Sequence, residues 1–393
     1  MHLAWGPEEE TFRTELCEFL DRDIPPEAKG GRDWATSGPE AGDDLIPDWG
    51  RKWQASLFDH GWMIPAYPPE LGGRNATPVQ TLVFLEEFAR RGLPRSLHFP
   101  GYAIVAPSLL EFGTERQKAL APAAIRGDTV WCIGMSEPNA GSDLASLSTR
   151  AVLDGERFIV NGQKVWTSYA SVAQKCFCYV RTATDVPKHK GISVLLLDMD
   201  TPGIDIRPLR HITGAAEFAE VFFTDVEVPR DNLVGQLNDG WRITLGSLAH
   251  ERGGLWVQGV STTEHALNNL IKLAKRLGLD GDPAVRRKLA EAHEQVASLR
   301  ALGYKGFSSF AQGSSAPEHS YLKLATSEMG KHLFELGMDL LGPYGAVVDS
   351  ERGEQAGRWP HSYLVSFAST IAGGSSEIQR NIIAERILGL PRG

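Results

Sequence analysis

The chain has 393 residues, of which 42% are apolar and 23% are charged, and its formal net charge is −9 at pH 7. This balance is typical of a globular protein with a large buried core, and the acidic charge, without any Lys/Arg block, argues against nucleic-acid binding. No apolar run reaches the ~18 residues of a membrane span, and the acidic N-terminus lacks the basic and apolar regions of a signal peptide, so we expect a cytoplasmic protein without a membrane segment.

Residues 1–127 have the pattern of a helical domain. Thr77 is a good N-cap, and Pro78 suits the first turn of the helix that follows it. A second start signal is Thr114 with Gln117 three residues later, which is the spacing of a capping box. One face of the helix after Thr77 has the i, i+3, i+4, i+7 spacing, with Thr81, Phe84, Leu85 and Phe88.

Residues 128–237 change to short stretches rich in β-branched and aromatic residues, which predict strands. These stretches are residues 157–160, 163–166, 176–180, 192–197 and 220–223. The pairs Asp154-Gly155 and Asn161-Gly162 separate neighbouring strands, and such pairs readily supply the positive φ angles of tight turns. Because no crossover helix intervenes, we expect an antiparallel β-barrel or sandwich and not a Rossmann unit.

The four cysteines of the chain are Cys17, Cys132, Cys176 and Cys178. Cys176 and Cys178 are two apart in a strand-like stretch, so their side chains should point to the same side. The pair lacks the CxxC spacing of metal and redox sites. We therefore expect reduced cysteines and no metal site.

Residues 238–393 are helical again and predict a four-helix bundle. The periodic segments are residues 241–277, 283–312, 321–341 and about 375–387. The fold class is therefore α+β, with helical domains at 1–127 and 238–393 on either side of a β domain at 128–237. There is no internal repeat, and residues 30–44 have the composition of a loop.

The segment from Gly134 to Ser146 follows a strand and is rich in small residues, so its backbone amides and serine hydroxyls could approach a ligand closely. Alone, such a segment is as often an ordinary Gly/Ser loop. With four further segments, in order and spacing, it resembles the acyl-CoA dehydrogenase family, and weaker likenesses at 67–73 and 113–118 extend the resemblance over nearly the whole chain. The four segments are residues 161–168, 238–241, 248–252 and 372–380.

The resemblance implies FAD as cofactor and places several residues around it. Met135 and Ser136 would bind the edge of the isoalloxazine ring, and Ser142 would contact the cofactor and the substrate near the thioester. The indole of Trp166 would pack on the flavin ring, and the hydroxyl of Ser168 would reach flavin N5, which accepts the hydride. Without the family context, a core tryptophan beside a solvent-exposed serine is the commoner interpretation of these two positions.

The catalytic base departs from the commonest pattern of the family. Many members carry a glutamate at the position of Gly373, and glycine cannot accept a proton. A minority branch, which includes the isovaleryl- and long-chain-specific enzymes, carries the base at the position of Glu251. The resemblance therefore implies α-proton abstraction by Glu251 with β-hydride transfer to flavin N5. The competing interpretation is a helix-surface carboxylate paired with a neighbour.

The resemblance gives roles to the residues beside these two positions. The backbone N–H of Gly373 would bond the thioester carbonyl, which acidifies the α carbon. Arg252 and Gly374 would contact substrate. Ser375 and Glu377 match positions that touch the adenine-side ribose and the phosphates of FAD, and the helix after Ser375 offers amide donors to the pyrophosphate.

Three positions depart from the family's contacts to the flavin pyrophosphate. Arg276 is a weak substitute for the usual arginine, Pro283 stands where a glutamine is usual, and Asp339 replaces another glutamine with an acid. An acid lies unfavourably beside a phosphate. These departures resemble the bacterial branch that degrades steroid side chains, in which two different subunits pair and only some sites hold flavin.

We therefore expect an FAD-dependent acyl-CoA dehydrogenase of fatty-acid or steroid side-chain catabolism that passes electrons to electron-transfer flavoprotein. A homo-oligomer (dimer or tetramer) and a heterotetramer with a homologous subunit both fit the sequence. Two alternatives stay open, a non-catalytic partner subunit and a flavin oxidase or monooxygenase on the same fold.

Overall fold

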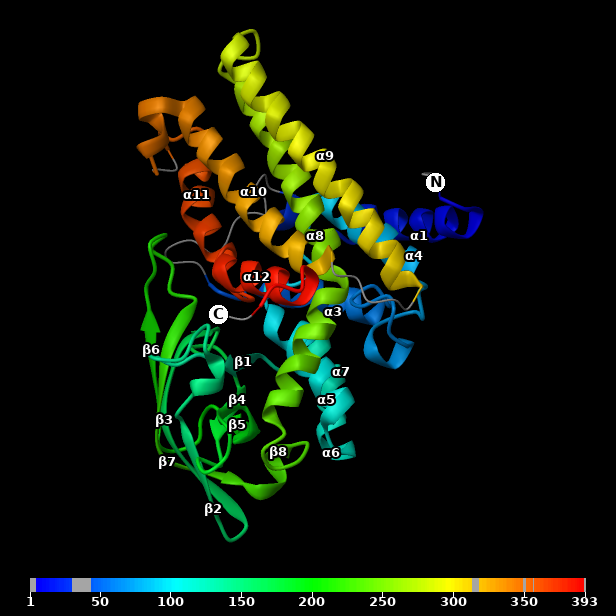
Figure 1. Cartoon of the computed structure of the whole chain (residues 1–393). Helices are drawn as coiled ribbons and strands as arrows, with labels where there is room; N and C mark the ends of the chain where they lie inside the picture. Colours follow the sequence, from blue (N-terminus) through cyan, green and yellow to red (C-terminus); the bar gives the residue numbers. More distant parts are fainter. Residues whose placement is uncertain (1–4, 30–43, 313–317, 349–350, 356, 392–393) are drawn as a thin grey trace. The chain divides into compact units, whose positions relative to one another are not determined.

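Figure 1 shows the computed structural model of the whole chain, residues 1–393. The structure describes residues 5–29, 44–312, 318–348, 351–355 and 357–391. Within these ranges, the side chains of residues 247–258, 310, 318 and 319 lie outside the described part. Apart from Asp44, the predicted loop over residues 30–44 also lies outside the described residues.

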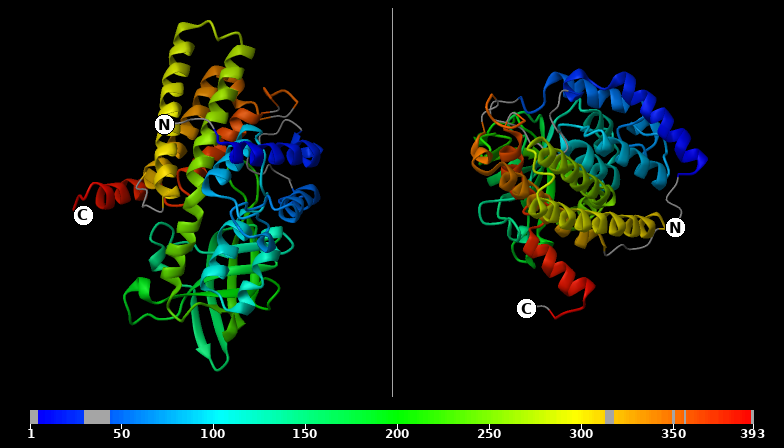
Figure 2. Two further views of the ribbon diagram at one scale, coloured as in Figure 1. Left: turned by 90° about the vertical axis from the view of Figure 1, so that its right-hand side faces the viewer. Right: turned by 90° about the horizontal axis from the view of Figure 1, so that it is seen from above.

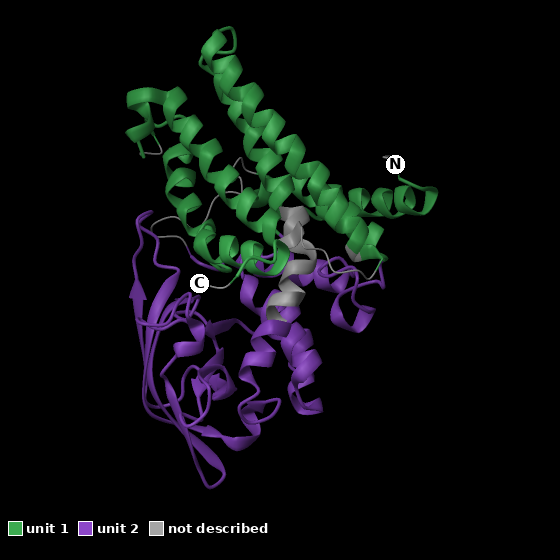
Figure 3. Ribbon diagram, viewed as in Figure 1, with its two compact units in different colours: residues 1–38, 77–94, 252–393 green, residues 39–76, 95–251 purple. Residues whose placement is uncertain are grey.

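The chain divides into two compact units, which Figure 3 colours separately. Unit 1 contains residues 1–38, 77–94 and 252–393, and unit 2 contains residues 39–76 and 95–251. This division follows contacts and not chain order, so it differs from the three sequence domains, whose boundaries stay a prediction.

Unit 2 contains the second capping signal of the sequence. The Thr114 hydroxyl accepts from the Gln117 N–H and the Gln117 side chain accepts from the Thr114 N–H, so the predicted capping box is confirmed. The helices of the unit are α3 (Asp48–Asp59), η1 (Pro69–Leu71), η2 (Gly101–Val105), α5 (Ala106–Phe112), α6 (Glu115–Lys118), α7 (Ala121–Arg126), η3 (Leu144–Ser146), η4 (Lys188–Lys190) and η5 (Arg230–Asn232).

The rest of unit 2 is one eight-stranded sheet in the order β6-β7-β3-β2-β4-β5-β8, with β1 beside β4. Most pairs are antiparallel, as predicted, but β1 and the first residue of β2 run parallel to β4. The strands are β1 (Trp131–Gly134), β2 (Arg150–Asp154), β3 (Arg157–Ser168), β4 (Lys175–Arg181), β5 (Ile192–Asp198), β6 (Ile204–Leu209), β7 (Phe218–Pro229) and β8 (Leu233–Val234).

The two predicted turns have different outcomes. Gly155, with φ +60°, lies in the tight turn between β2 and β3, which pair from Asp154 opposite Arg157. The turn predicted at Asn161-Gly162 is wrong, because both residues lie inside β3, where the register to β7 shifts. Gly162 is needed there for a different reason, since a Cβ would lie 2.6 Å from the Cα of Thr149. A glycine in a strand marks this bulge and not a chain reversal.

Three of the four cysteines belong to the core of the sheet. Cys132, Cys176 and Cys178 are at most 1% exposed, and all four cysteines are free. A Cβ at Gly134 would lie 3.0 Å from Cys178 Sγ and 3.3 Å from Cys176 Sγ, so the two thiols point to the same side, as predicted. A hydrogen bond with Cys132 raises the pKa of Cys176 and one with Cys176 raises the pKa of Cys178, and burial adds to both rises.

Unit 1 is helical. Figures 1 and 2 show α9 and α10 side by side, with α11 against α10. The helix α11 is missing from the sequence-based expectation. The helices are α1 (Pro7–Asp23), α2 (Pro26–Lys29), α4 (Pro78–Arg90), α8 (Gly240–Arg276, of which unit 1 contains residues from 252), α9 (Pro283–Ala311), α10 (Glu318–Leu341), η6 (Gly342–Ala346), α11 (Arg358–Ser369), α12 (Ser376–Ile382) and η7 (Ile383–Ile387).

The first capping signal is also confirmed. Thr77 and Gln80 form a capping box at the start of α4, with Pro78 in the first turn. The face that follows is buried at Phe84, Leu85 and Phe88, as its spacing predicts.

Candidate active site

The first group of predicted ligand contacts lies on the loop after β1, at Met135, Ser136 and Ser142. Met135 and Ser136 are half-buried, whereas Ser142 is exposed. A Cβ at Gly141 would meet no atom within 4 Å, so the backbone beside Ser142 is open to an approaching ligand.

A buried ion pair anchors this loop. The Lys164 ammonium of β3 is 2.8 Å from a carboxylate oxygen of Glu137, and the two side chains are 0% and 5% exposed. The Glu137 carboxylate also accepts from the N–H and hydroxyl of Ser148 at 2.6 and 2.8 Å and from the N–H of Thr149 at 2.8 Å. Burial alone would raise the pKa of Glu137, but attraction to Lys164 and these hydrogen bonds outweigh it and lower the pKa to about 2.

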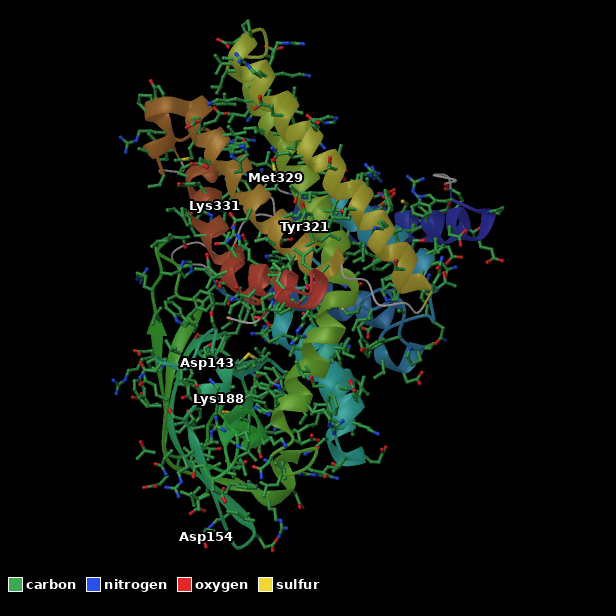
Figure 4. The ribbon with its side chains drawn as sticks, viewed as in Figure 1. Asp143, Asp154, Lys188, Tyr321, Met329 and Lys331 are labelled. Atoms are coloured by element: carbon green, nitrogen blue, oxygen red, sulfur yellow. The ribbon has the colours of Figure 1, made fainter. Side chains whose placement is uncertain are left out.

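Two more cations hold the far end of the loop. The Arg181 guanidinium, 8% exposed, donates to the carbonyls of Ala145, Leu147 and Lys188. The Lys188 ammonium lies 2.7 Å from both carboxylate oxygens of Asp143, and the two side chains are adjacent in Figure 4. The loop that carries Ser142 is therefore fixed at both ends, and sequence reasoning missed these residues because their partners are backbone carbonyls or distant in the chain.

The second group of predicted contacts lies at the end of β3. Trp166 has φ +58° and is 54% exposed, Thr167 is buried and Ser168 is half-buried. Burial alternates over these three residues, and the shared side of Trp166 and Ser168 stays a prediction. The register to β7 shifts between Lys164 and Thr167, and this bulge directs the indole outward. The ring is supported edge-on by Phe218, with centroids 5.8 Å apart.

A half-buried acid beside these residues, Glu217, was not predicted from the sequence. The Glu217 carbonyl accepts from the N–H of Tyr169, and burial raises the pKa of the Glu217 carboxyl. Its carboxylate oxygen is 3.9 Å from His211 Nε2. Glu217 directly precedes Phe218, which pairs with Ser168 across the sheet, and this long-range register is the information that the sequence alone lacks.

The third group of predicted residues lies between α11 and α12 in unit 1. Gly373 and Gly374 have φ +66° and +95°, a conformation that favours glycine. The Lys323 ammonium of α10 donates to the Gly374 carbonyl at 2.7 Å, and the Gln379 amide donates to the Gly373 carbonyl at 3.1 Å. These bonds fix the two carbonyls.

Ser375 is the N-cap of α12, because its hydroxyl accepts from the N–H of Ile378. The pKa of Glu377 is lowered by hydrogen bonds from its own N–H and from the Ser375 hydroxyl. The structure therefore brings Gly373, Gly374, Ser375 and Glu377 together at one helix start. Their predicted ligand contacts stay a prediction.

Glu251 and Arg252 lie on α8, as the sequence predicts, but their side chains are outside the described residues. The structure does describe what stands at the alternative position. An added Cβ at Gly373 would meet only Lys323 Cε, at 3.9 Å, so the described part of the chain leaves room for a Cβ there.

The positions that depart from the family's pyrophosphate contacts form other contacts within unit 1. Arg276 pairs with Glu354 at 2.9 Å, and Lys288 pairs with Asp339 at 3.1 Å. Pro283 is the first residue of α9, whose first amides donate to the Asp282 carboxylate. Arg276 and Asp339 are thus held by charges of this chain.

A groove in unit 1 does not coincide with the predicted site. It has a volume of about 1520 Å³ and lies between α9, α10 and η7, with Tyr321, Met329 and Lys331 in its lining (Figure 4). None of the predicted site residues lines it. The predicted ligand contacts therefore lie outside this groove, in the three groups of residues described above.

Family descriptions match the chain in three consecutive pieces. "Acyl-CoA dehydrogenase, N-terminal domain" matches residues 6–128, the "middle domain" matches residues 132–226 and the "C-terminal domain" matches residues 238–388. The chain belongs to the acyl-CoA dehydrogenase family. The α+β fold with two helical domains and a central β-sheet domain is thereby confirmed, as is its membership of an oxidoreductase class.

Named relatives of this acyl-CoA dehydrogenase support the family assignment. Acyl-CoA dehydrogenase IpdE1 of Mycobacterium tuberculosis is 40% identical over 87% of this chain and 88% of its own length. The solved structure named Tcur3481-Tcur3483 steroid ACAD has a TM-score of 0.86 at 29% identity, and the ChsE4-ChsE5 complex of Mycobacterium tuberculosis has 0.82 at 30%, each covering 100% of both chains. The predicted likeness to steroid-degrading members is confirmed by these structures.

The residues of the site fit a flavin, the cofactor of the family. Within unit 2, an indole held outward offers an aromatic face, Ser168 offers a hydroxyl, and the open backbone at Gly141 leaves room for close approach. In the described part of the chain, no group of three or more metal-ligating side chains occurs, and no helix is long and apolar enough to cross a membrane.

Proposed function

We propose that this chain is an FAD-dependent dehydrogenase that introduces a double bond between Cα and Cβ of an acyl-CoA thioester. Glu251 takes the α proton, and FAD, when bound, supplies the hydride acceptor. The N–H of Gly373 bonds the thioester carbonyl and so lowers the pKa of the α carbon, which lets a carboxylate act as base.

One observation carries this assignment. Gly373, at the position where many relatives have the base, has φ +66° and open space around an added Cβ. No carboxylate is available there, so the proton must go to another group. Glu251 on α8 stands at the alternative family position and has the required chemistry. Both positions come from the sequence pattern, and the backbone geometry at Gly373 supports the choice between them.

The remaining site residues hold the cofactor and substrate in this proposal. Trp166 packs on the flavin ring, Ser168 donates to its hydride-accepting edge, and Met135 and Ser136 line the ring's other edge. Ser142, Arg252 and Gly374 contact substrate, while Ser375 and Glu377 lie at the ribose and phosphates. The partner for electrons is electron-transfer flavoprotein, and reoxidation by oxygen is slow because bound product shields the ring.

We extend to this chain the substrate class named for its structural neighbour, a steroid-derived acyl-CoA. The test is anaerobic titration of the purified yellow protein with steroid side-chain and straight-chain acyl-CoA thioesters. Bleaching of the flavin band by the steroid thioester at a lower concentration is the expected result. Bleaching by neither thioester would reject the dehydrogenase function, and equal bleaching by both would reject only the substrate class.

A second candidate, a partner subunit without its own turnover, is favoured by two ion pairs. Arg276 is held by Glu354, and Asp339 by Lys288, at positions where relatives contact the flavin pyrophosphate. We propose assembly with a homologous subunit that completes this contact, as the ChsE4-ChsE5 complex joins two chains. Flavin content of the assembly decides between the candidates, because a silent subunit would leave its own site colourless.

A further inference from the structure

The buried pair of Glu137 and Lys164 does more than close a loop. The Lys164 ammonium donates not only to Glu137 but also, at 3.2 Å, to the carbonyl of Met135. The next residue of β3, Val165, donates its N–H to the carbonyl of Ser136 at 3.0 Å. Two successive residues of the loop are thus bonded to two successive residues of the strand.

These bonds join the two segments proposed to contact the flavin. Met135 and Ser136 lie on the loop, and Trp166 follows Val165 directly. The tight turn between Glu137 and Ala140, with reciprocal backbone bonds of 3.0 Å, keeps the loop from shifting after Ser136. Any displacement of Lys164 therefore moves both segments.

The bond to Met135 also has an electrostatic effect. The carbonyl of Met135 and the N–H of Ser136 belong to one peptide group, and a cation on the carbonyl polarises the N–H at its other end. Among the residues that the structure describes, no hydrogen-bond acceptor is found for this N–H. It is therefore left to bond a ligand, and Lys164 strengthens it as a donor.

Stability alone does not account for such a pair. Replacing a buried ion pair by apolar residues of similar volume is often neutral or stabilising, because both charges lose their hydration. Lys175 and Asp198 form an ion pair on the same sheet whose side chains are 30% and 52% exposed, so a surface pair provides a matched comparison. The desolvation cost of the buried pair is instead explained by the charge that it places at the carbonyl of Met135, in the peptide proposed to bind the flavin.

We propose that Glu137 and Lys164 are positioning residues of the flavin site, in which the Lys164 ammonium orients and polarises the Met135–Ser136 peptide toward the flavin and Glu137 balances its charge. This inference rests on the proposed flavin binding. Because reduced flavin carries more negative charge than oxidised flavin, the pair tunes the reduction potential as well as affinity.

The test compares Lys164→Met and Glu137→Gln with wild type and with the control Lys175→Met. Oxidised FAD is titrated into apoprotein to give its dissociation constant, and the two-electron midpoint potential is measured by spectroelectrochemistry. Lys164→Met removes the cation, so the ratio of reduced-to-oxidised flavin affinity should fall at least tenfold, which is about 30 mV lower in potential. Glu137→Gln leaves the cation unbalanced, so the potential should rise.

Opposite shifts for the two variants, with no shift for Lys175→Met, support the proposal, because a merely loosened loop would move both in one direction. Shifts of the same sign, or none beyond the control, overturn it. If Lys164→Met does not fold, Glu137→Gln alone decides, and a zero or negative shift overturns the proposal. Failure of wild type to bind FAD, both alone and co-expressed with a homologous subunit, would instead overturn the proposed function, and this inference with it.

Discussion

At the scale of a single residue, Trp166 combines a left-handed backbone with an exposed side chain. Its left-handed backbone, φ +58°, costs a non-glycine residue roughly 1–2 kcal/mol, and its indole is 54% exposed, so little packing is gained in return within the described chain. We expect Trp166→Ala to lower FAD occupancy through loss of ring packing. Trp166→Gly should lower occupancy equally but unfold at higher temperature than Trp166→Ala, because glycine relieves the strain by about 1 kcal/mol. Full FAD occupancy in Trp166→Ala would contradict the role of the indole.

His98 predicts a pH dependence of stability. The ring is 1% exposed, its Nε2 lies 2.7 Å from the Trp131 carbonyl oxygen, and burial lowers its pKa to about 4. The unfolded chain has a pKa near 6.5, so stability is full above that pH and is lost as pH falls toward 4, by roughly 3 kcal/mol at most. Denaturant unfolding of His98→Asn between pH 7 and 4 should show a flatter profile than wild type. The exposed His60→Asn should keep the wild-type slope, and an unchanged slope in His98→Asn would refute the assignment.

At the scale of elements, the backbone conformation of the connection between α11 and α12 limits which residues position 373 can accommodate. In Gly373→Glu the Cβ has room but the residue must take φ +66°, so we expect a cost of about 1 kcal/mol in thermal unfolding and no loss of folding. Gly373→Ala should cost about the same, since the strain belongs to the backbone. Unfolding of Gly373→Glu with wild-type stability in Gly373→Ala would show that the side chain and not the backbone is excluded.

Single helices, turns and strands also show which features the sequence could predict. The N-cap at Thr77, the capping box at Thr114 and the turn at Gly155 depend on neighbouring residues and were predicted correctly. Asn161-Gly162 was misread as a turn, because a bulge between β3 and β7 depends on a partner strand distant in sequence. The same limit hid the bonds from Lys164 and Arg181 to the loop after β1. Features that depend on neighbouring residues could be predicted from the sequence, whereas contacts with residues distant in the chain could not.

At the scale of the whole molecule, the ion pairs Arg276–Glu354 and Lys288–Asp339 predict dependence on a second, homologous subunit. Expressed alone, the chain should bind FAD weakly, and co-expression with the homologue should give a larger complex with a higher ratio of 450 to 280 nm absorbance. Light scattering measures the size of the complex, and release of the flavin from the protein measures how much FAD it holds. A monomer of this chain that holds stoichiometric FAD would contradict this assembly.

The central claim is that Glu251 is the base, and the most direct measurement is stopped-flow reduction of the flavin by the acyl-CoA identified in the titration. Glu251→Gln keeps size and hydrogen bonding but cannot accept a proton. We predict unchanged FAD binding and ligand affinity with a reduction rate at least ~10² to 10⁴-fold lower, the usual contribution of a positioned base. Combining it with Gly373→Glu should restore part of the rate by moving the carboxylate to the position common in the family. If Glu251→Gln reduces its flavin at the wild-type rate, another group takes the proton and the proposed mechanism is wrong.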